Sequence, residues 1–402
     1  MDKMELLCDV SLWSRAIEHG IEKKISKPFL SLVSNPHGRL AIIEAIESGR
    51  YEIEPPRIVE IPKPNGKMRE VYVNSPMDRV VLSLVNEMYC SIYKGMIHEK
   101  CVSYKKGISV PIIIHSLIKK LSEGYVGYKV DISKYFDSVN KETLFKTLQC
   151  VSTNSPLDEM LLKYYSDDRV LIGGKIVERY KSIAQGCAFG TFLANLVLSD
   201  VDAELDKMDI IYLRYSDDIL MLGEDAGKAL NRLGEMLSTK GLELNPKKVE
   251  KIKKDSEFTF LGAKIKEKEI DISDESVNRF KNKIRSITKT RKNVQIHNRA
   301  SQIRAIKKIN SYLREGYMKD SRQFGWEKYF FSLVNTNKTI IMLDEFVKDR
   351  LKMVYTGKGN HTTNMHKTSN EQLKEMGYKS LNHLYQLHCI SKDVYNAEIC
   401  KV

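Results

Sequence analysis

The tetrapeptide Tyr-Ser-Asp-Asp occurs twice in the chain, at residues 165–168 and at residues 215–218. The second copy lies between two strongly apolar stretches, residues 210–213 and 219–222. This pattern predicts a strand, a tight turn and a second strand, with the aspartates at the tip. The first copy falls where an amphipathic helix is predicted to end in solvent. Only the second copy has the rigid support that catalytic geometry needs, and we expect it to be the functional one.

The adjacent carboxylates of Asp217 and Asp218 repel each other at neutral pH unless a cation lies between them. Hard divalent cations, Mg²⁺ above all, prefer such oxygen ligands. Two ions about 3.5–4 Å apart can stabilise both the attacking and the leaving oxygen of a phosphoryl transfer. Such a site generally needs a further carboxylate, and the candidate is Asp131, near the end of the alternating apolar stretch 125–132. Its spacing alone fits an aspartate in a strand-end turn equally well.

The bulk composition narrows the class of protein. With 402 residues, 42% of them hydrophobic and 29% charged, the chain can bury the cores of about two to four structural units. No stretch is apolar and long enough to predict a membrane span, and the N-terminal residues lack an export signal, so a cytoplasmic protein is expected. The seven cysteines never occur in Cys-x-x-Cys spacing, which predicts neither a disulfide framework nor a zinc site.

The net charge of +13 is concentrated in one segment. Residues 279–314 contain 12 Lys or Arg and no Asp or Glu. A solvated helix face usually mixes both signs, and a one-sign stretch of this length repels itself unless a polyanion lies against it. We therefore expect nucleic acid as a partner. The candidate contact residues are Arg279, Lys283, Arg291, Arg304 and Lys308.

Further elements follow from periodicity and turn residues. Residues 57–73 alternate as two strands around Pro64-Asn65-Gly66, which predicts a hairpin with basic residues near its tip. A second hairpin is predicted to turn on Gly173-Gly174. Helices are predicted within residues 1–50, from Asp78 to Ile97, and after the N-cap residue Asn140. The chain is therefore predicted to be α+β.

A series of motifs resembles those of reverse transcriptases. Three resemble successive palm motifs: VDISKYFDSV, AQGCAFGTFLANLVL and RYSDDILML. Upstream, IPKPNGKMREVYV and NSPMDRVV are similar to the fingers motifs of the bacterial group, and downstream, GLELNPKKVEKI and FTFLGAKI resemble the last two palm motifs. Any one motif is weak, but their order from about Ile61 to Ile265 is very specific. The resemblance implies a right-hand polymerase fold with fingers, a palm with an antiparallel sheet, and a helical thumb.

The resemblance also implies roles for the carboxylates and their neighbours. The metal ligands of the family match Asp131 and Asp217, Asp218 completes the acidic triad, and the carbonyl of Ile132 assists. The implied cofactor is a pair of Mg²⁺ ions, with Mn²⁺ as a substitute. Phe136 matches the aromatic gate that excludes a ribose 2′-hydroxyl, although it could equally pack in a core.

Further residues match the nucleotide site of the family. Gln185 and Gly186 match the pair that lines the nucleotide pocket, whereas the flanking Ala184 and Cys187 depart from the more usual Pro and Ser-Pro. Lys67 and Arg69 match the cations that hold the triphosphate, with Lys63 and Arg79 in support. On composition alone these four would be solubilising surface residues. Lys248 matches a lysine that protonates the leaving pyrophosphate, and the neighbouring Lys247 leaves the register open.

The predicted segments follow from this alignment of motifs. They are an N-terminal helical region at 1–56, fingers at 57–124, palm at 125–268, a thumb at 269–350 and a C-terminal helical extension at 351–402. The basic stretch falls where the family has its thumb, which tracks a template–primer duplex through the phosphates. The sequence beyond it is similar to the thumb of group II intron enzymes.

Within the family, the chain resembles the compact, stand-alone enzymes of the "unknown group" and the abortive-infection type. It lacks an HNH-like nuclease, the Val-Thr-Gly of retron enzymes and the Ser-Gln of diversity-generating enzymes. The resemblance implies RNA-directed DNA synthesis from deoxynucleoside triphosphates on a bound noncoding RNA, in defence against phage. An accessory defence protein or a second copy of the chain would be further partners. The alternatives are a maturase-like RNA-binding protein, untemplated or protein-primed DNA synthesis, and a retron or group II intron-type enzyme.

Overall fold

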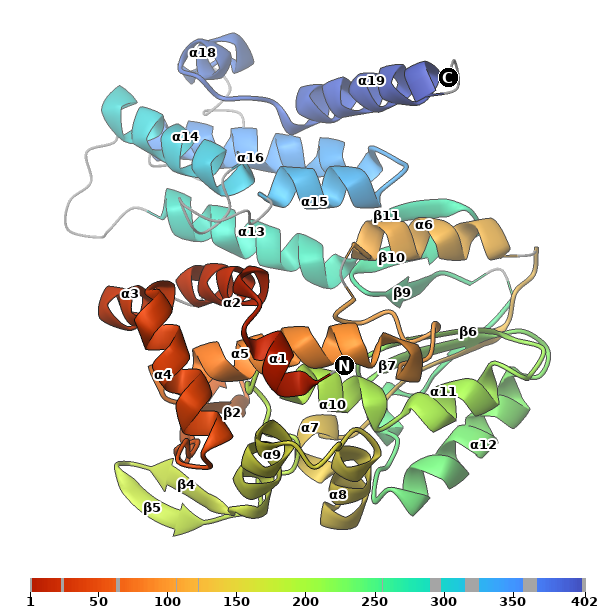
Figure 1. The fold of residues 1–402 in the computed structure, drawn as a ribbon. Helices are drawn as coiled ribbons and strands as arrows, with labels where there is room; N and C mark the ends of the chain where they lie inside the picture. The colour runs from red at the N-terminus through yellow and green to blue at the C-terminus, as the bar shows by residue number, and fades with distance from the viewer. Residues whose placement is uncertain are drawn as a thin grey trace. The chain divides into compact units, whose positions relative to one another are not determined.

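A computed structural model describes residues 2–22, 25–62, 66–105, 107–121, 123–254, 256–289, 298–314, 325–356 and 367–399. The chain forms two compact units (Figure 1). The first contains Met1–Lys106 and Val126–Lys251, and the second contains Gly107–Tyr125 and Ile252–Val402. These units are coarser than the five predicted segments, whose boundaries stay a prediction. Among the described residues, no helix is apolar and long enough to cross a membrane.

A four-stranded sheet forms the centre of the first unit. Its strands, in the order β6-β7-β3-β8, are Ile211–Tyr215, Asp218–Leu222, Gly127–Asp131 and Glu250–Ile252. Strand β7 pairs antiparallel with both β6 and β3. Its residues Ile219 to Leu222 are all buried, so both faces of this strand are covered. Gly127 lets β3 approach β7, because a Cβ there would lie 2.1 Å from the carbonyl oxygen of Met221.

A second sheet of the first unit contains both predicted hairpins. Its strands, in the order β2-β1-β4-β5, are Met68–Val73, Arg57–Pro62, Arg169–Ile172 and Lys175–Glu178. The predicted hairpins β1–β2 and β4–β5 are both present, each with antiparallel pairing. Residues 63–65, which include the candidate Lys63, lie outside the described residues.

Helices surround these sheets and supply most of the first core. They are α1 Lys3–Leu7, α2 Val10–Glu22, α3 Lys27–Ser34, α4 Pro36–Glu47, α5 Pro76–Ile92, α7 Tyr135–Ser138, α8 Lys141–Cys150, α9 Pro156–Ser166, α10 Gly190–Leu196, α11 Ser199–Leu205 and α12 Ala226–Thr239, with the short 3₁₀ turns η1 Lys94–Met96 and η2 Pro246–Lys248. Asn140 caps α8 as predicted, since its side chain accepts a hydrogen bond from the backbone N–H of Thr143. The helix predicted from Asp78 to Ile97 ends earlier, at Ile92, and η1 with its Gly95 follows.

The second unit combines a small sheet with a helical bundle. Its strands, in the order β11-β10-β9, are Glu269–Ile272, Ala263–Lys266 and Phe258–Phe260. Its helices are α6 Val110–Lys120, α13 Asp274–Thr288, α14 Arg299–Arg314, α15 Trp326–Leu333, α16 Lys338–Thr356, α18 Asn370–Glu375 and α19 Leu381–Ile399. Helix α16 packs against α13, α14 and α19 over a separate apolar core. The predicted α+β class, with an antiparallel palm-type sheet and a helical thumb region, is confirmed.

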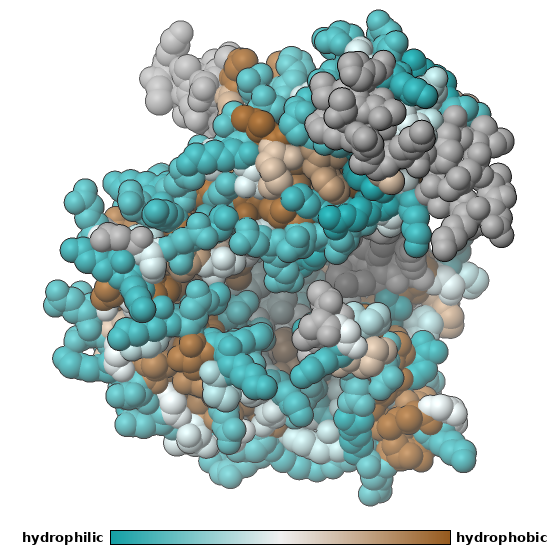
Figure 2. Space-filling view, turned by 180° about the vertical axis from the view of Figure 1, so that it is seen from behind, coloured by the Kyte–Doolittle hydropathy of each residue, from teal (hydrophilic) through white to brown (hydrophobic). Residues whose placement is uncertain are grey.

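Polar side chains cover most of the surface in the space-filling view (Figure 2). Smaller apolar patches lie between them. Exposed apolar residues include Ile176 on β5 and Ile390 on α19. Scattered exposed apolar side chains are usual for a folded protein and need no partner.

A buried ion pair anchors the N-terminal helix of the first unit. Lys3 is 2% exposed, and its ammonium contacts Asp158 at the start of α9 and donates to the carbonyl oxygen of Val151 at 2.6 Å. Asp158 also accepts hydrogen bonds from Tyr89 and from the backbone N–H of Thr153. Burial alone would raise the pKa of Asp158, but the hydrogen bonds from Lys3 and Tyr89 lower it to about 2.

This pKa predicts a loss of stability in acid. Because the pKa of Asp158 is lower in the folded state than its ordinary 3.8, its stabilisation is full above pH 4 and disappears as the pH falls towards 2. The difference corresponds to about 2 kcal/mol. We expect Asp158→Asn to lower the free energy of unfolding by at least about 2 kcal/mol at pH 7, with a deficit that narrows below pH 4.

Fluorescence of the buried Trp13 can report this unfolding if the second tryptophan is removed by Trp326→Phe. The exposed pair of Glu142 and Lys146 supplies the control, and Glu142→Gln should leave the free energy of unfolding nearly unchanged. Equal destabilisation by the two variants would contradict the anchoring role of Asp158.

Candidate functional site

The second Tyr-Ser-Asp-Asp forms the predicted hairpin tip. Tyr215 pairs with Asp218 across the β6–β7 hairpin, so Ser216 and Asp217 form a two-residue turn. Ser216 is 4% exposed and has a φ of 59°, in the left-handed region that favours glycine. A non-glycine residue there costs about 1–3 kcal/mol and is often associated with a functional site. The carbonyl of Asp217 accepts a hydrogen bond from the backbone N–H of Ile132 at 3.1 Å, which ties the turn to β3.

Sheet register brings the three candidate carboxylates together. Asp131 is the residue of β3 that lies directly opposite Asp218 of β7. Burial, followed by the charge of Asp131, raises the pKa of Asp217. Burial, followed by the charges of Asp217 and Asp131, raises the pKa of Asp218 to about 6. The hairpin thus concentrates negative charge in a poorly solvated place, and binding of a cation would relieve the repulsion.

Asp131 is held by the segment that precedes β8. The backbone N–H of Asn245 donates to the backbone carbonyl of Asp131 at 2.8 Å, and its side-chain amide lies 3.4 Å from the Asp131 carboxylate. The Lys248 ammonium lies 2.5 Å from the other carboxylate oxygen. Burial would lower the pKa of Lys248, but the hydrogen bond and charge of Asp131 raise it. The neighbouring Lys247 meets Asn245 through its backbone N–H, at 3.2 Å, and the role of Lys248 as the functional lysine stays a prediction.

The donor set suits a divalent cation by its chemistry. Asp131, Asp217 and Asp218 offer hard carboxylate oxygens, which Mg²⁺ and Mn²⁺ prefer. As the side chains stand, no group of three or more His, Cys, Asp or Glu within the described part of the chain is arranged to hold a metal ion. The Lys248 ammonium supplies positive charge at Asp131. The carboxylates therefore fit a divalent cation by their donor chemistry, and their role as metal ligands stays a prediction.

The first Tyr-Ser-Asp-Asp has a different environment. Tyr165 is buried in the core at the end of α9, and Asp167 is the C-cap residue of this helix. Asp167 pairs with Arg169 and Asp168 with Lys141, each at 2.9 Å. The prediction that this copy ends in solvent was therefore only partly right, because both aspartates are half-buried and each has its own cation. Neither needs a metal ion to balance its charge.

The candidate gate residue lies on the short helix α7. Tyr135 is buried, and its hydroxyl donates to the carbonyl of Ala194 at 2.5 Å. Phe136 is half-buried and lies edge-to-face with Tyr135, with a centroid distance of 5.6 Å. The backbone carbonyl of Phe136 accepts from Ile183 at 3.2 Å. Phe136 is therefore only partly buried against the first core, and its role as a gate stays a prediction.

The loop with Gln185 and Gly186 packs on strand β2. The carbonyl of Gln185 accepts from the backbone N–H of Tyr72 at 2.7 Å. Gly186 has a φ of 107°, and a Cβ there would lie 2.4 Å from the side chain of Val71. Glycine is therefore needed for the approach of this loop to β2. This need for glycine does not depend on the predicted role of Gly186 in the nucleotide pocket, and that role stays a prediction.

The remaining described candidates lie on the β1–β2 hairpin and on helices α5, α13 and α14. In the first unit, Lys67 and Arg69 are exposed on the β1–β2 hairpin, and burial lowers the pKa of the half-buried Arg79 on α5. In the second unit, the exposed candidates are Arg279 on α13 and both Arg304 and Lys308 on α14. Lys283 of α13 lies over the ring of Tyr312, 5.8 Å from its centroid. Arg291 lies outside the described residues.

Sequence reasoning missed the groups that support the hairpin. Arg214, on β6, is fully buried, and its guanidinium lies 2.5 Å from the Asp202 carboxylate on α11. It also donates to the backbone carbonyls of Ser216 at 3.3 Å and Asn195 at 3.0 Å. A charged residue next to an apolar strand was the available signal, because such a residue is rarely buried without a partner. Asp202 itself offered no local signal.

Comparisons with known proteins agree with the motif order. The sequence profile of the family described as "Reverse transcriptase (RNA-dependent DNA polymerase)" matches residues 61–265. A COX1/OXI3 intron 1 protein of Saccharomyces cerevisiae is 22% identical over 41% of this chain and 20% of its own length. Protein YkfC of Escherichia coli is 25% identical over 40% of this chain and 43% of its own length. The chain thus spans less than half of the length of these relatives.

Solved structures show a weaker likeness. Telomerase from Candida albicans in complex with an RNA fragment has a TM-score of 0.44 at 11% identity, over 84% of this chain and 64% of the telomerase. Apo telomerase from Candida tropicalis has a TM-score of 0.45 at 13% identity, over 83% of this chain and 68% of the telomerase. Likenesses at this level carry no argument about function.

The contact between Lys248 and Asp131 predicts a change in metal affinity. Lys248→Gln removes a charge that repels and competes with a cation, so we expect Mn²⁺ to bind about three- to tenfold more tightly. Titration of Mn²⁺ followed by electron paramagnetic resonance measures this affinity. Lys247→Gln is the matched control and should change it less than about twofold, while Asp218→Asn should weaken binding at least about tenfold. An equal response to both lysine substitutions would contradict the assignment.

Proposed function

Because the chain belongs to the reverse transcriptase (RNA-dependent DNA polymerase) family, we propose that it copies RNA into DNA at the site of Asp131, Asp217 and Asp218. The observation that carries this proposal is the register that sets Asp131 opposite Asp218 beside a strained turn. A protein that only binds RNA has no need for carboxylates whose pKa values are raised by burial and by a neighbouring carboxylate. It is unfavourable to place these carboxylates close together with little solvent. Binding of cations for catalysis would explain why the protein does so.

The three aspartates, with the carbonyl of Ile132, are the proposed ligands of two Mg²⁺ ions, which Mn²⁺ could replace. Bound ions of this kind stabilise the charge that develops on the attacking 3′-oxygen and on the leaving pyrophosphate. Lys248 would donate a proton to the pyrophosphate. Its contact with Asp131 supports this role, because it places the ammonium beside the proposed metal ligands.

Other residues of the first unit would bind the incoming deoxynucleotide. Lys67 and Arg69, exposed on the hairpin, would hold the triphosphate, with Lys63 and Arg79 in support. Phe136 would contact the sugar, and a 2′-hydroxyl would collide with its ring. Gln185 and Gly186 would line the pocket from a loop whose backbone is fixed to β2.

The second unit would hold the template–primer duplex. Exposed cations on α13 and α14 would contact phosphates without reading sequence. The proposed contacts are Arg279, Lys283, Arg291, Arg304 and Lys308. Within the described part of α13 and α14 the exposed positions include several cations and the apolar positions face the core, which supports an electrostatic contact with a polyanion.

The biological role proposed for this activity is phage defence in the bacterial cytoplasm, with a dedicated noncoding RNA as template. The resemblance of the fingers motifs to those of the bacterial group supports this choice. A maturase-like RNA-binding protein is the second candidate. It is favoured by the names of two relatives, the COX1/OXI3 intron 1 protein and a 91 kDa protein in the cob intron of Schizosaccharomyces pombe, 23% identical over 42% of this chain and 21% of its own length.

The two copies of Tyr-Ser-Asp-Asp supply a matched test of the site. We expect Asp217→Asn to lower the rate of DNA synthesis on a primed RNA template at least about 100-fold, because it removes a group that stabilises the transition state. Asp167→Asn changes the same residue type in the other copy and should retain more than half of the activity. Primer extension with deoxynucleotides measures both, and an equal loss from both would overturn the assignment.

The nucleic acid that co-purifies with the protein separates the two candidate functions. We expect one dominant RNA with wild type, accompanied by complementary DNA, and the same RNA without DNA for the Asp217→Asn, Asp218→Asn double variant. RNA without DNA in both samples, with and without phage infection, would favour the maturase-like function.

The gate proposal predicts a change in sugar selectivity. Phe136→Ala should raise incorporation of ribonucleotides relative to deoxynucleotides about tenfold or more, because it removes the ring that excludes the 2′-hydroxyl. Tyr135→Phe is the control, since it removes the hydroxyl of a buried neighbour and should leave selectivity unchanged. If Phe136→Ala lowers only thermal stability and leaves selectivity as it was, Phe136 is a core residue and no gate.

A further inference from the structure

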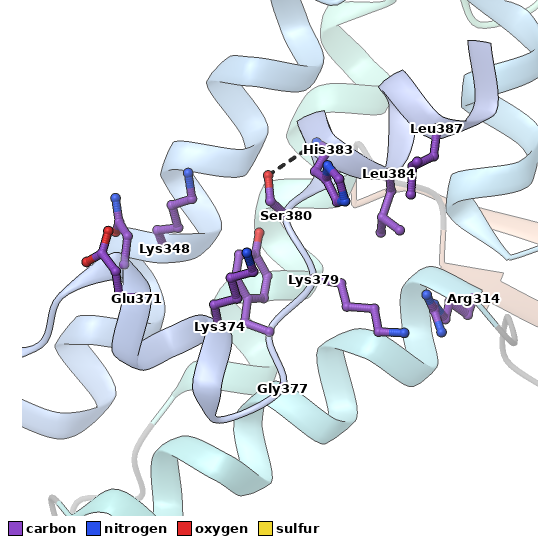
Figure 3. A pocket seen from close by; sticks show the side chains of 12 residues that line it. Arg314, Lys348, Glu371, Lys374, Gly377, Lys379, Ser380, His383, Leu384 and Leu387 are labelled. Atoms are coloured by element: carbon purple, nitrogen blue, oxygen red, sulfur yellow. Dashed lines mark hydrogen bonds between the residues drawn. The ribbon is translucent and has the colours of Figure 1, made fainter. Parts of the chain in front are cut away.

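The second unit contains a pocket of about 680 Å³ that the proposed polymerase function does not use (Figure 3). It lies among the end of α14, helix α16, helix α18, the linker 376–380 and the start of α19. A volume of this order is typical of small-molecule sites, which span about 300–1,000 Å³.

One wall of this pocket is fixed by a buried carboxylate. Asp344 of α16 is 2% exposed and accepts hydrogen bonds from the hydroxyls of Tyr378 at 2.7 Å and Ser380 at 2.8 Å. It also accepts one from the backbone N–H of Leu381 at 2.7 Å, and Lys348 lies 2.8 Å away. This network holds the linker and the start of α19 against α16, so the pocket exists before a ligand arrives.

The pocket wall carries more positive than negative charge, with Arg314, Lys348, Lys374 and Lys379 against Glu371. Arg314 and Lys379 form no hydrogen bond or ion pair with the residues that the structure describes, and Figure 3 shows Lys379 extending toward Arg314. Both cations lie near Glu327, whose pKa is raised by burial and lowered by their charges. Lys348 differs, because Asp344 and Glu345 already neutralise it. Cations that outnumber the acids in a concave site attract an anion.

An apolar surface adjoins these cations. Leu384 and Leu387 project from α19 into the pocket, and Leu387 is 49% exposed. The exposed ring of His383 lies on the same helix. An anionic group beside an exposed apolar surface matches the two parts of a nucleotide, its phosphate and its base.

We propose that this pocket binds a nucleotide, with its phosphate between Arg314 and Lys379 and its base against Leu384 and Leu387. The guanidinium of Arg314 can form paired hydrogen bonds with phosphate oxygens, and Lys379 adds a second charge. The nucleotide is either a free nucleoside monophosphate or an unpaired 5′-phosphorylated end of an RNA strand. The pocket is a separate site, and its occupation does not depend on DNA synthesis.

Binding of AMP and of a 5′-phosphorylated single-stranded RNA pentamer to the full chain tests this proposal. Isothermal titration in EDTA compares wild type with the Arg314→Gln, Lys379→Gln double variant. The control is Lys119→Gln, Lys120→Gln, which removes the same charge from exposed positions on α6. We expect the pocket variant to weaken binding of at least one probe tenfold or more, while the control stays within threefold.

The two probes identify the source of the nucleotide. A loss confined to AMP assigns the pocket to a free nucleotide, and a loss confined to the RNA assigns it to a strand end. Leu387→Ser should weaken the same probe without a change in charge, which separates base contact from general attraction. Equal effects of the pocket variant and the control, or no effect of either, would overturn the proposal. Neither outcome bears on DNA synthesis, which the Asp217→Asn variant tests separately.

Discussion

The candidate site depends on a buried ion pair that belongs to none of its functional residues. Arg214 and Asp202 are both fully buried, and Asp202 also accepts a hydrogen bond from Tyr212 at 2.7 Å. Through the carbonyls of Ser216 and Asn195, the same guanidinium fixes the turn to helix α10. Loss of one partner of such a pair leaves an uncompensated charge in the interior, at a cost of about 3–5 kcal/mol. The ion pair therefore holds strand β6, the turn and helices α10 and α11 in one arrangement.

This rigidity allows the hairpin to hold groups that would otherwise separate. Burial, together with the charges of neighbouring carboxylates, raises the pKa values of Asp217 and Asp218, and Ser216 has a backbone conformation unfavourable to a side chain. In a flexible loop, the carboxylates would move apart and the backbone of Ser216 would leave its unfavourable conformation. A supported loop retains both arrangements. The ammonium of Lys248 neutralises part of the negative charge through its contact with Asp131.

The two copies of Tyr-Ser-Asp-Asp show how far four identical residues can differ in environment. In the first copy, Asp167 is neutralised by Arg169, the residue directly after the tetrapeptide, and Asp168 is neutralised by Lys141. In the second copy, Asp218 faces Asp131 across the sheet. Flanking apolar stretches already separated a helix end from a hairpin tip. The local charge balance was not visible in the sequence, because Lys141 and Asp131 lie far along the chain from the aspartates that they meet.

The sequence by itself determined the elements that depend on neighbouring residues. These include the β6–β7 hairpin, the β1–β2 and β4–β5 hairpins, the cap at Asn140 and the order of the family motifs, because turn residues and alternation act over a few positions. Only the tertiary structure decided that Lys248 and not Lys247 contacts Asp131, that Gly186 is required by β2, and that Asp202 neutralises Arg214. These contacts join residues that are distant in the chain. Their geometry follows from strand register and from the course of loops, which no local pattern specifies.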